Sequence, residues 1–197
     1  MMPPISPQNY GPAVAELLAP ERLNELGPGE PNRGARTKLD ALSAETLVAP
    51  QTMGDRAMAE ACLAALWLYH DFPDESHSIS QQLETVEGSY WHGILHRREP
   101  DYANAKYWFR RVGRHPIGAE LAAAARELAQ SAPADRSTEF RAEQDAWDHF
   151  RFVDLCQAAA AGGRSAAELL CRKIQQREWE LLFDYCYRRA CANANEG

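Results

Sequence analysis

Apolar residues recur at helical spacing along most of the chain, and this pattern predicts a series of helices. The clearest segment is residues 55–70, which is rich in Ala, Leu and Met, residues that favour helix. It is apolar nearly all round and is therefore predicted to be the most buried helix. Strict apolar–polar alternation is absent, so no sheet is expected. A short helix interrupted by Pro20 is predicted over residues 13–26, and further helices over residues 37–48, 74–83, 89–98, 102–113, 117–130, 138–161 and 165–192.

Proline and glycine mark where these helices end. Residues 1–12 contain four prolines and are predicted to be a flexible N-terminal arm. The segment GPGEPNRG at residues 27–34 is predicted to be a loop, as is the turn at residues 85–88. Pro100 ends one helix, and Asp101 is suited to cap the next. A length of 197 residues fits one domain, which we expect to span residues 13–197.

Residues 61–116 divide into two consecutive helix pairs of about 28 residues each. In the second pair, the apolar positions and a late proline follow the order Trp91, Ile94, Leu95, Ala105, Phe109 and Pro116. This order resembles the tetratricopeptide repeat, and the segment DYANAKYWF looks like the second helix of its shorter class. The usual repeat has about 34 residues. The same region is also similar to microbial proteins without an assigned activity.

The resemblance implies a fold class and a kind of function. The fold is expected to be all-α, with antiparallel helical hairpins stacked in a tetratricopeptide-like array and a long C-terminal helix. It also implies a binding module. In the final helix the apolar residues either pack on the core or form a homodimer surface; they are Ile174, Trp179, Leu182, Phe183 and Cys186.

Charge and cysteine content narrow the partners and the compartment. The net charge of −7 argues against nucleic acid or an anionic membrane as partner. No apolar stretch reaches the ~18 residues of a membrane span. The five cysteines are odd in number and form no zinc-type CxxC pair. They are interpreted as buried free thiols, which favours a reducing, cytoplasmic location.

Four of the six histidines lie within 27 residues: His70, His77, His92 and His96. His92 and His96 are four residues apart and share one helix face. If the hairpins are antiparallel, the two turns meet at one end of the stack. The four imidazoles, with Asp71, Asp74 or Glu75, are then a candidate site for a divalent metal ion. The HExxH pattern is absent, which excludes a metalloprotease of that type.

Residues 89–116 contain six Lys and Arg residues but only two acidic ones. Arginine offers a planar fork of donors to phosphate and carboxylate groups. A candidate anion site therefore comprises Arg97, Arg98, Arg110, Arg111 and His115, flanked by Tyr107 and Trp108.

Three interpretations of residues 70–115 stay open. The preferred one is a binding module that recognises a small anionic molecule or an acidic peptide at this rim. The alternative is a metal-dependent enzyme that uses the four histidines. In the third, the histidines bond across the turns and the arginines pair with acidic residues elsewhere. No GxSxG elbow or Walker lysine motif is present.

Overall fold

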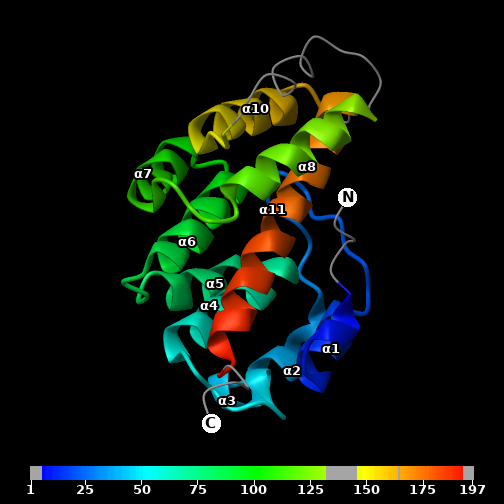
Figure 1. Ribbon diagram of the computed structural model, residues 1–197. Coiled ribbons are helices and arrows are strands. Elements are labelled where there is room, and N and C mark those ends of the chain that lie inside the picture. Colours follow the sequence, from blue (N-terminus) through cyan, green and yellow to red (C-terminus); the bar gives the residue numbers. More distant parts are fainter. Residues whose placement is uncertain (1–5, 132–145, 164, 193–197) are drawn as a thin grey trace.

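The computed structural model describes residues 6–131, 146–163 and 165–192. Within these ranges the protein consists of ten α-helices and two short 3-10 helices, without a β-strand. One isolated bridge joins Met53 to Cys191. The prediction of an all-α fold is confirmed for this part of the chain (Figure 1).

The helices agree with the predicted segments through the middle of the chain. The helix predicted over 138–161 is seen from residue 149, and residues 138–145 lie outside the described ranges. The elements are η1 (Pro7–Asn9), α1 (Pro12–Leu18), η2 (Arg33–Ala35), α2 (Arg36–Asp40), α3 (Ala44–Val48), α4 (Arg56–Tyr69), α5 (Pro73–Ser80), α6 (Val86–Arg98), α7 (Tyr102–Val112), α8 (Gly118–Gln130), α10 (His149–Ala161) and α11 (Ala166–Ala190).

Side-chain caps begin several of these helices. The carboxylate of Asp101 accepts a hydrogen bond from Asn104 N (3.2 Å), as predicted for the start of α7. Ser165 Oγ accepts from Glu168 N at the start of α11. Thr85 Oγ1 accepts from Gly88 N (3.0 Å). The predicted loop at residues 85–88 is therefore wrong, because Thr85 caps α6 and the following residues form its first turn.

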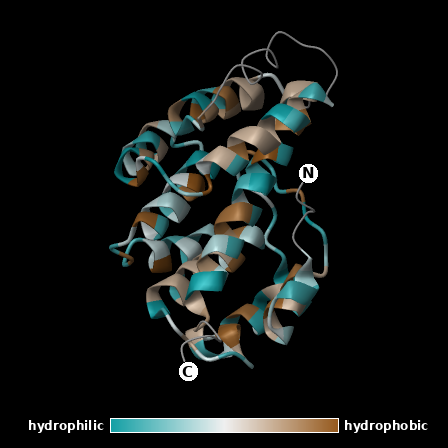
Figure 2. Cartoon of the chain, in the orientation of Figure 1, coloured by the Kyte–Doolittle hydropathy of each residue, from teal (hydrophilic) through white to brown (hydrophobic). Residues whose placement is uncertain are grey.

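The core forms where α4, α6 and α11 meet. Helix α11 runs through the middle of the molecule and packs on α4, α8 and α10, while α6 packs on α4, α5 and α7 (Figure 1). Trp179 of α11 donates from Nε1 to Ala65 O (3.0 Å) and stacks on Phe183. The apolar residues of α11 named above are all buried within the chain. Hydrophobic and hydrophilic residues alternate around the long helices (Figure 2), as packing on a shared core requires.

Residues 19–32 form a non-helical segment, here called the strap, between α1 and η2. The helix predicted over residues 13–26 ends at Leu18, close to the interruption expected at Pro20. The prediction is wrong for residues 21–26, which are not helical. Polar side chains hold the strap between α4 and α11: Arg172 of α11 donates from Nε to Asn24 O (3.1 Å), and Asn24 Nδ2 donates to Tyr69 O (3.0 Å).

The described part of the predicted N-terminal arm, residues 6–12, packs against α11. Tyr10 is buried beside Phe183 and Tyr187. Gly11 N donates to Tyr187 Oη (2.8 Å). These contacts differ from the flexible arm expected for this part of the sequence, because Tyr10 contributes an aromatic ring to the core.

Candidate functional site

Three histidines come together between α5 and α6. His77 lies on α5, and His92 and His96 lie on α6. One ligand atom from each ring lies within 4.8 Å of the other two. The ring centroids are 4.5 Å apart for His77 and His92, and 4.7 Å apart for His92 and His96. We call these three residues the histidine cluster.

Local structure explains why these rings meet. His92 and His96 are separated by one turn of α6, so their side chains share a face. Helix α5 begins at Pro73 and packs against α6, which brings His77 onto the same face. His92 and His96 are 2% and 7% exposed, whereas His77 is half-buried. The cluster is thus a mainly buried group that reaches the surface at His77.

The imidazole of His92 lies between α7 and α5. The Trp108 indole stacks on it at 4.0 Å between centroids, with 20° between the ring planes. On the α5 side, Ser80 Oγ lies 3.5 Å from His92 Nδ1. These contacts hold the ring in one orientation and leave its Nε2 without a protein hydrogen bond among the described residues.

His96 contacts one acidic and one amide side chain. Its Nδ1 lies 3.0 Å from Glu99 Oε2, and its Nε2 lies 3.1 Å from Asn104 Nδ2. Glu99 follows α6 directly, and Asn104 is in the first turn of α7. The short turn at Pro100 therefore brings both partners to the same imidazole.

Burial favours the neutral form of the two α6 histidines of the cluster. Desolvation lowers the pKa of His92 to about 3, with His96 and His77 adding to the effect. Burial also lowers the pKa of His96, against the raising influence of Glu99. A neutral imidazole has a free lone pair, and this neutral form of the ring binds metal ions.

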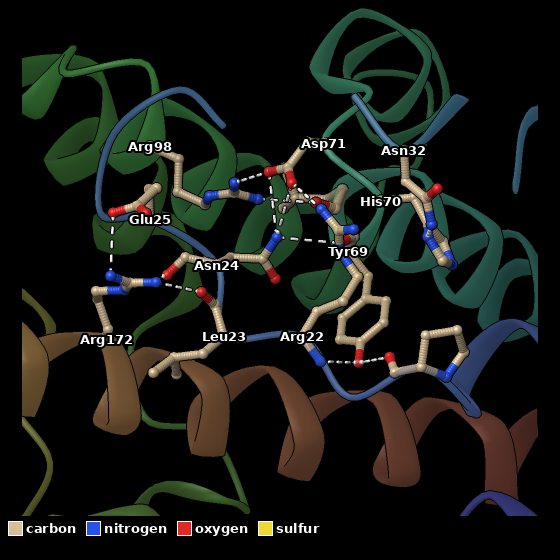
Figure 3. A network of polar contacts seen from close by, with 12 residues as sticks. Arg22, Leu23, Asn24, Glu25, Asn32, Tyr69, His70, Asp71, Arg98 and Arg172 are labelled. Atoms are coloured by element: carbon tan, nitrogen blue, oxygen red, sulfur yellow. Dashed lines mark hydrogen bonds and ion pairs between the residues drawn. The ribbon is translucent and has the colours of Figure 1, made fainter. Parts of the chain in front are cut away.

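The structure does not bring His70 into this cluster. His70 is the C-terminal cap residue of α4. Its Nδ1 lies 3.0 Å from Asn32 Nδ2, and its carbonyl accepts a hydrogen bond from Asn32 N (Figure 3). Burial lowers its pKa to about 4. The metal site predicted with four histidines is therefore reduced to three, because the strap draws His70 to a different part of the molecule.

The guanidinium of Arg98 takes part in a network of hydrogen bonds and ion pairs inside the protein. It is 6% exposed, donates from Nη1 to Leu68 O (2.8 Å) and pairs with Asp71. Asp71 also pairs with Arg22 and accepts hydrogen bonds from Asn24 (Figure 3). The expectation that Arg98 binds an external anion is not supported, because a protein carboxylate already occupies its guanidinium.

Arg97 and His115 are internal as well. Arg97 is fully buried and pairs with Glu178 of α11, with Nη2 2.5 Å from Oε2. His115 is buried, and its Nε2 lies 3.6 Å from Glu87 Oε1. The neighbouring side chain of His115 lowers the pKa of Glu87. Neither side chain reaches the surface where the sequence placed an anion.

The other four predicted anion-binding residues lie at the surface of α7. Tyr107, Arg110 and Arg111 are exposed, and Trp108 is half-buried. Arg111 Cζ lies 5.1 Å from the centroid of Trp108. Arg110 Cζ lies 5.9 Å from the ring of Phe150. No ion pair among the described residues includes Arg110 or Arg111, and both side chains are exposed.

The sequence did not predict the contact between Trp108 and His92, because Trp108 was interpreted either as a flank for an anion or as a core residue. Helical spacing places Asn104, Trp108 and Arg111 on one face of α7, and Asn104 contacts His96. The face of α7 that carries them is therefore the one beside the histidine cluster.

No described helix combines the length and apolar character needed to cross a membrane. Comparison of the chain with protein-family models, with curated proteins and with solved structures found no match. Functional inference consequently depends on the geometry of the site.

Proposed function

We propose that the protein binds a divalent transition-metal ion, with zinc as the first candidate, at the histidine cluster. His77, His92 and His96 each offer one ligand atom, and these three atoms lie within 4.8 Å of one another. This observation carries the proposal. Around a tetrahedral zinc ion with bonds of ~2.0–2.1 Å, ligand nitrogens are roughly 3.4 Å apart. Modest side-chain rotation, mainly of the half-buried His77, would close the difference.

The ligand set suggests which chemistry the ion would support. Imidazole suits zinc, copper, iron and nickel better than magnesium or calcium. Structural zinc sites usually have four protein ligands, whereas catalytic sites keep three and leave a position for water or substrate. We therefore propose a metal-dependent enzyme in which the ion acts as a Lewis acid or activates water.

Contacts behind the ligands support the same proposal. Ligating histidines usually hold a second polar group on the ring nitrogen that does not bind the metal. Ser80 lies beside Nδ1 of His92, and Glu99 lies beside Nδ1 of His96. This arrangement leaves Nε2 of both rings for the ion, once Asn104 moves from Nε2 of His96.

Cobalt titration tests the proposal, because tetrahedral cobalt(II) absorbs visible light far more strongly than the hydrated ion. We expect about one equivalent to bind, as for a single site, and His77→Gln to abolish the absorption. His70→Gln is the matched control, since it removes a histidine outside the cluster. Circular dichroism should show that both variants retain their helices. Equal cobalt binding by wild type and His77→Gln would contradict the proposed site.

A second candidate function is recognition of a small anion or an acidic peptide end on the surface of α7. The observation in its favour is the exposed guanidinium of Arg111 over the ring of Trp108. Of the residues predicted for the anion site, Tyr107 and Trp108 lie beside Arg111, whereas Arg110 lies over Phe150 and Arg97 and Arg98 are paired internally.

A tetratricopeptide-like arrangement of α4–α5 and α6–α7 is also proposed. In its support, each of these pairs packs together, and α4 packs on α6. Ala105 and Phe109 are both buried, as the resemblance implies. An added Cβ at Gly93 would lie 3.0 Å from the Phe109 ring, so the small residue permits this close packing. An experimental structure in which the two pairs did not superpose would contradict the repeat.

A homodimer through α11 has less support, because the apolar residues that suggested it are buried within the chain. Leu169, near the start of α11, is 43% exposed. Light scattering tests this proposal: a dimer that Leu169→Glu dissociates would support it, and a monomer at all concentrations would contradict it.

A further inference from the structure

Trp108 connects the histidine cluster to an exposed positive charge. Its indole stacks on His92 at 4.0 Å, and the guanidinium carbon of Arg111 lies 5.1 Å from the same indole. The two distances together place Arg111 Cζ no more than about 9 Å from the ring centroid of His92. The exposed Arg111 therefore shares an aromatic partner with a proposed metal ligand.

The two arginines at the end of α7 have different surroundings. Both are exposed, and neither pairs with a carboxylate among the described residues. Arg110 lies over Phe150 of α10, whereas Arg111 lies over Trp108. Only Arg111 shares an aromatic partner with a histidine of the cluster, so the chain contains a matched control for its charge.

We infer that Arg111 and the metal ion at the histidine cluster hold the same small oxyanion, a phosphate or carboxylate group of the substrate. This inference rests on the proposed metal site. An oxyanion bridging a metal and a guanidinium spans roughly 7–8 Å from the ion to Cζ, given metal–oxygen bonds of ~2 Å and charge-assisted hydrogen bonds of ~2.8 Å. Because a bound ion would lie roughly 3 Å from the His92 ring centroid, the limit of about 9 Å between that centroid and Arg111 Cζ allows this span.

The arrangement gives each group a separate role. The ion takes one oxygen of the anion at its open coordination position, and Arg111 donates to another oxygen through its planar fork. Imidazole is a neutral ligand, so three coordinating histidines would leave the charge of the ion uncompensated, which favours an anionic ligand. The carboxylate of Glu99 contacts His96, so it orients this ligand rather than competing for the guanidinium.

The test uses cobalt-loaded protein with inorganic phosphate and acetate as probes. Each anion is titrated while the visible spectrum of cobalt is recorded, in wild type, Arg111→Gln and Arg110→Gln. We expect at least one anion to change the spectrum of the wild type. Its affinity should fall about tenfold or more in Arg111→Gln, the loss of one charge-assisted contact, and stay within about twofold in Arg110→Gln. The anion with the higher affinity shows whether the substrate group is a phosphate or a carboxylate.

The possible failures are distinguishable. If the wild type takes up no cobalt, the proposed metal site fails, and this inference fails with it. If cobalt binds but neither anion changes its spectrum, the metal site stands and the shared oxyanion is overturned. The same conclusion follows if Arg111→Gln and Arg110→Gln bind the anion equally well, because the charge of Arg111 would then have no specific part in binding.

Discussion

The imidazole of His92 stacks on the indole of Trp108, with centroids 4.0 Å apart and ring planes within 20°. This contact joins α6 to α7 and covers one face of a proposed metal ligand. A ring held in place by packing loses less freedom when it coordinates an ion. The stacking thus links the packing of two helices to the affinity of the site.

Replacing Trp108 tests this link. We expect Trp108→Leu to weaken cobalt binding by about tenfold, the lower end of effects seen for groups that orient ligands. Trp108→Phe keeps an aromatic face and should lose less. Competition with a chelator of known affinity measures both values. Equal affinities for Trp108→Leu and the wild type would show that stacking does not prepare the ligand.

A substitution at Gly29 tests the contact between the strap and Asp71. A Cβ at Gly29 would lie 2.6 Å from Asp71 Cγ, and Asp71 is held by Arg22 and Arg98. We expect Gly29→Ala to lower the free energy of unfolding by about 1–3 kcal/mol. Gly27→Ala is the control, since nothing lies within 4 Å of a Cβ there. Urea denaturation that shows the same stability for both variants would contradict this account of the strap.

The buried ion pair between Arg97 and Glu178 joins α6 to α11, and both side chains are fully buried. Removing one partner leaves an uncompensated charge. We expect Arg97→Met or Glu178→Leu alone to lower the free energy of unfolding by about 3–5 kcal/mol. The double variant should lose clearly less than the sum of the two. Additive losses in the double-mutant cycle would mean that the pair is not coupled.

Because His149 is buried, we expect the protein to lose stability in acid. Burial lowers its pKa to about 3, helped by the charge of Arg97, whereas the unfolded chain has a histidine pKa near 6.5. The unfolded state therefore binds the proton more readily as pH falls. The stabilising contribution is complete above pH ~6.5 and is lost progressively toward pH ~3. From this one group, the free energy of unfolding should fall by about 2 kcal/mol between pH 7 and pH 5.

His149→Phe is the variant that checks this pH dependence. Phenylalanine retains the stacking on Phe109, which is 4.7 Å away between centroids, but it cannot titrate. Urea denaturation at pH 7 and pH 5 should show a smaller acid loss in the variant than in the wild type. Equal losses would assign the acid sensitivity to other buried groups, including His70.

Helical periodicity predicted the middle of the fold because α4, α6 and α7 carry their own signals of spacing, caps and breaks. The pairing of His92 with His96 follows from the same periodicity. Helical periodicity failed in the strap after Pro20, where polar contacts with α4 and α11 determine the path of the chain. Such contacts join residues far apart in the sequence, as for Arg172 and Asn24.

The burial of Arg97 and Arg98 was the other feature that could not be predicted from the sequence. Arg97 and Arg98 were taken for surface residues because arginine is rarely buried without a partner. Their partners, Glu178 and Asp71, lie in other helices or turns. The residues next to each arginine in the sequence therefore do not indicate that such a pair forms. The structure therefore moves the candidate site away from these arginines and toward the histidine cluster.

Zinc retention tests the central claim most directly. Wild type and His96→Gln are loaded with zinc, dialysed against metal-free buffer and measured by elemental analysis, with circular dichroism as the check on folding. We expect about one zinc ion per wild-type chain, as for a single three-histidine site, and nearly none in His96→Gln. A wild-type chain that retains no zinc, or a folded variant that retains as much as the wild type, would contradict a metal site at His77, His92 and His96.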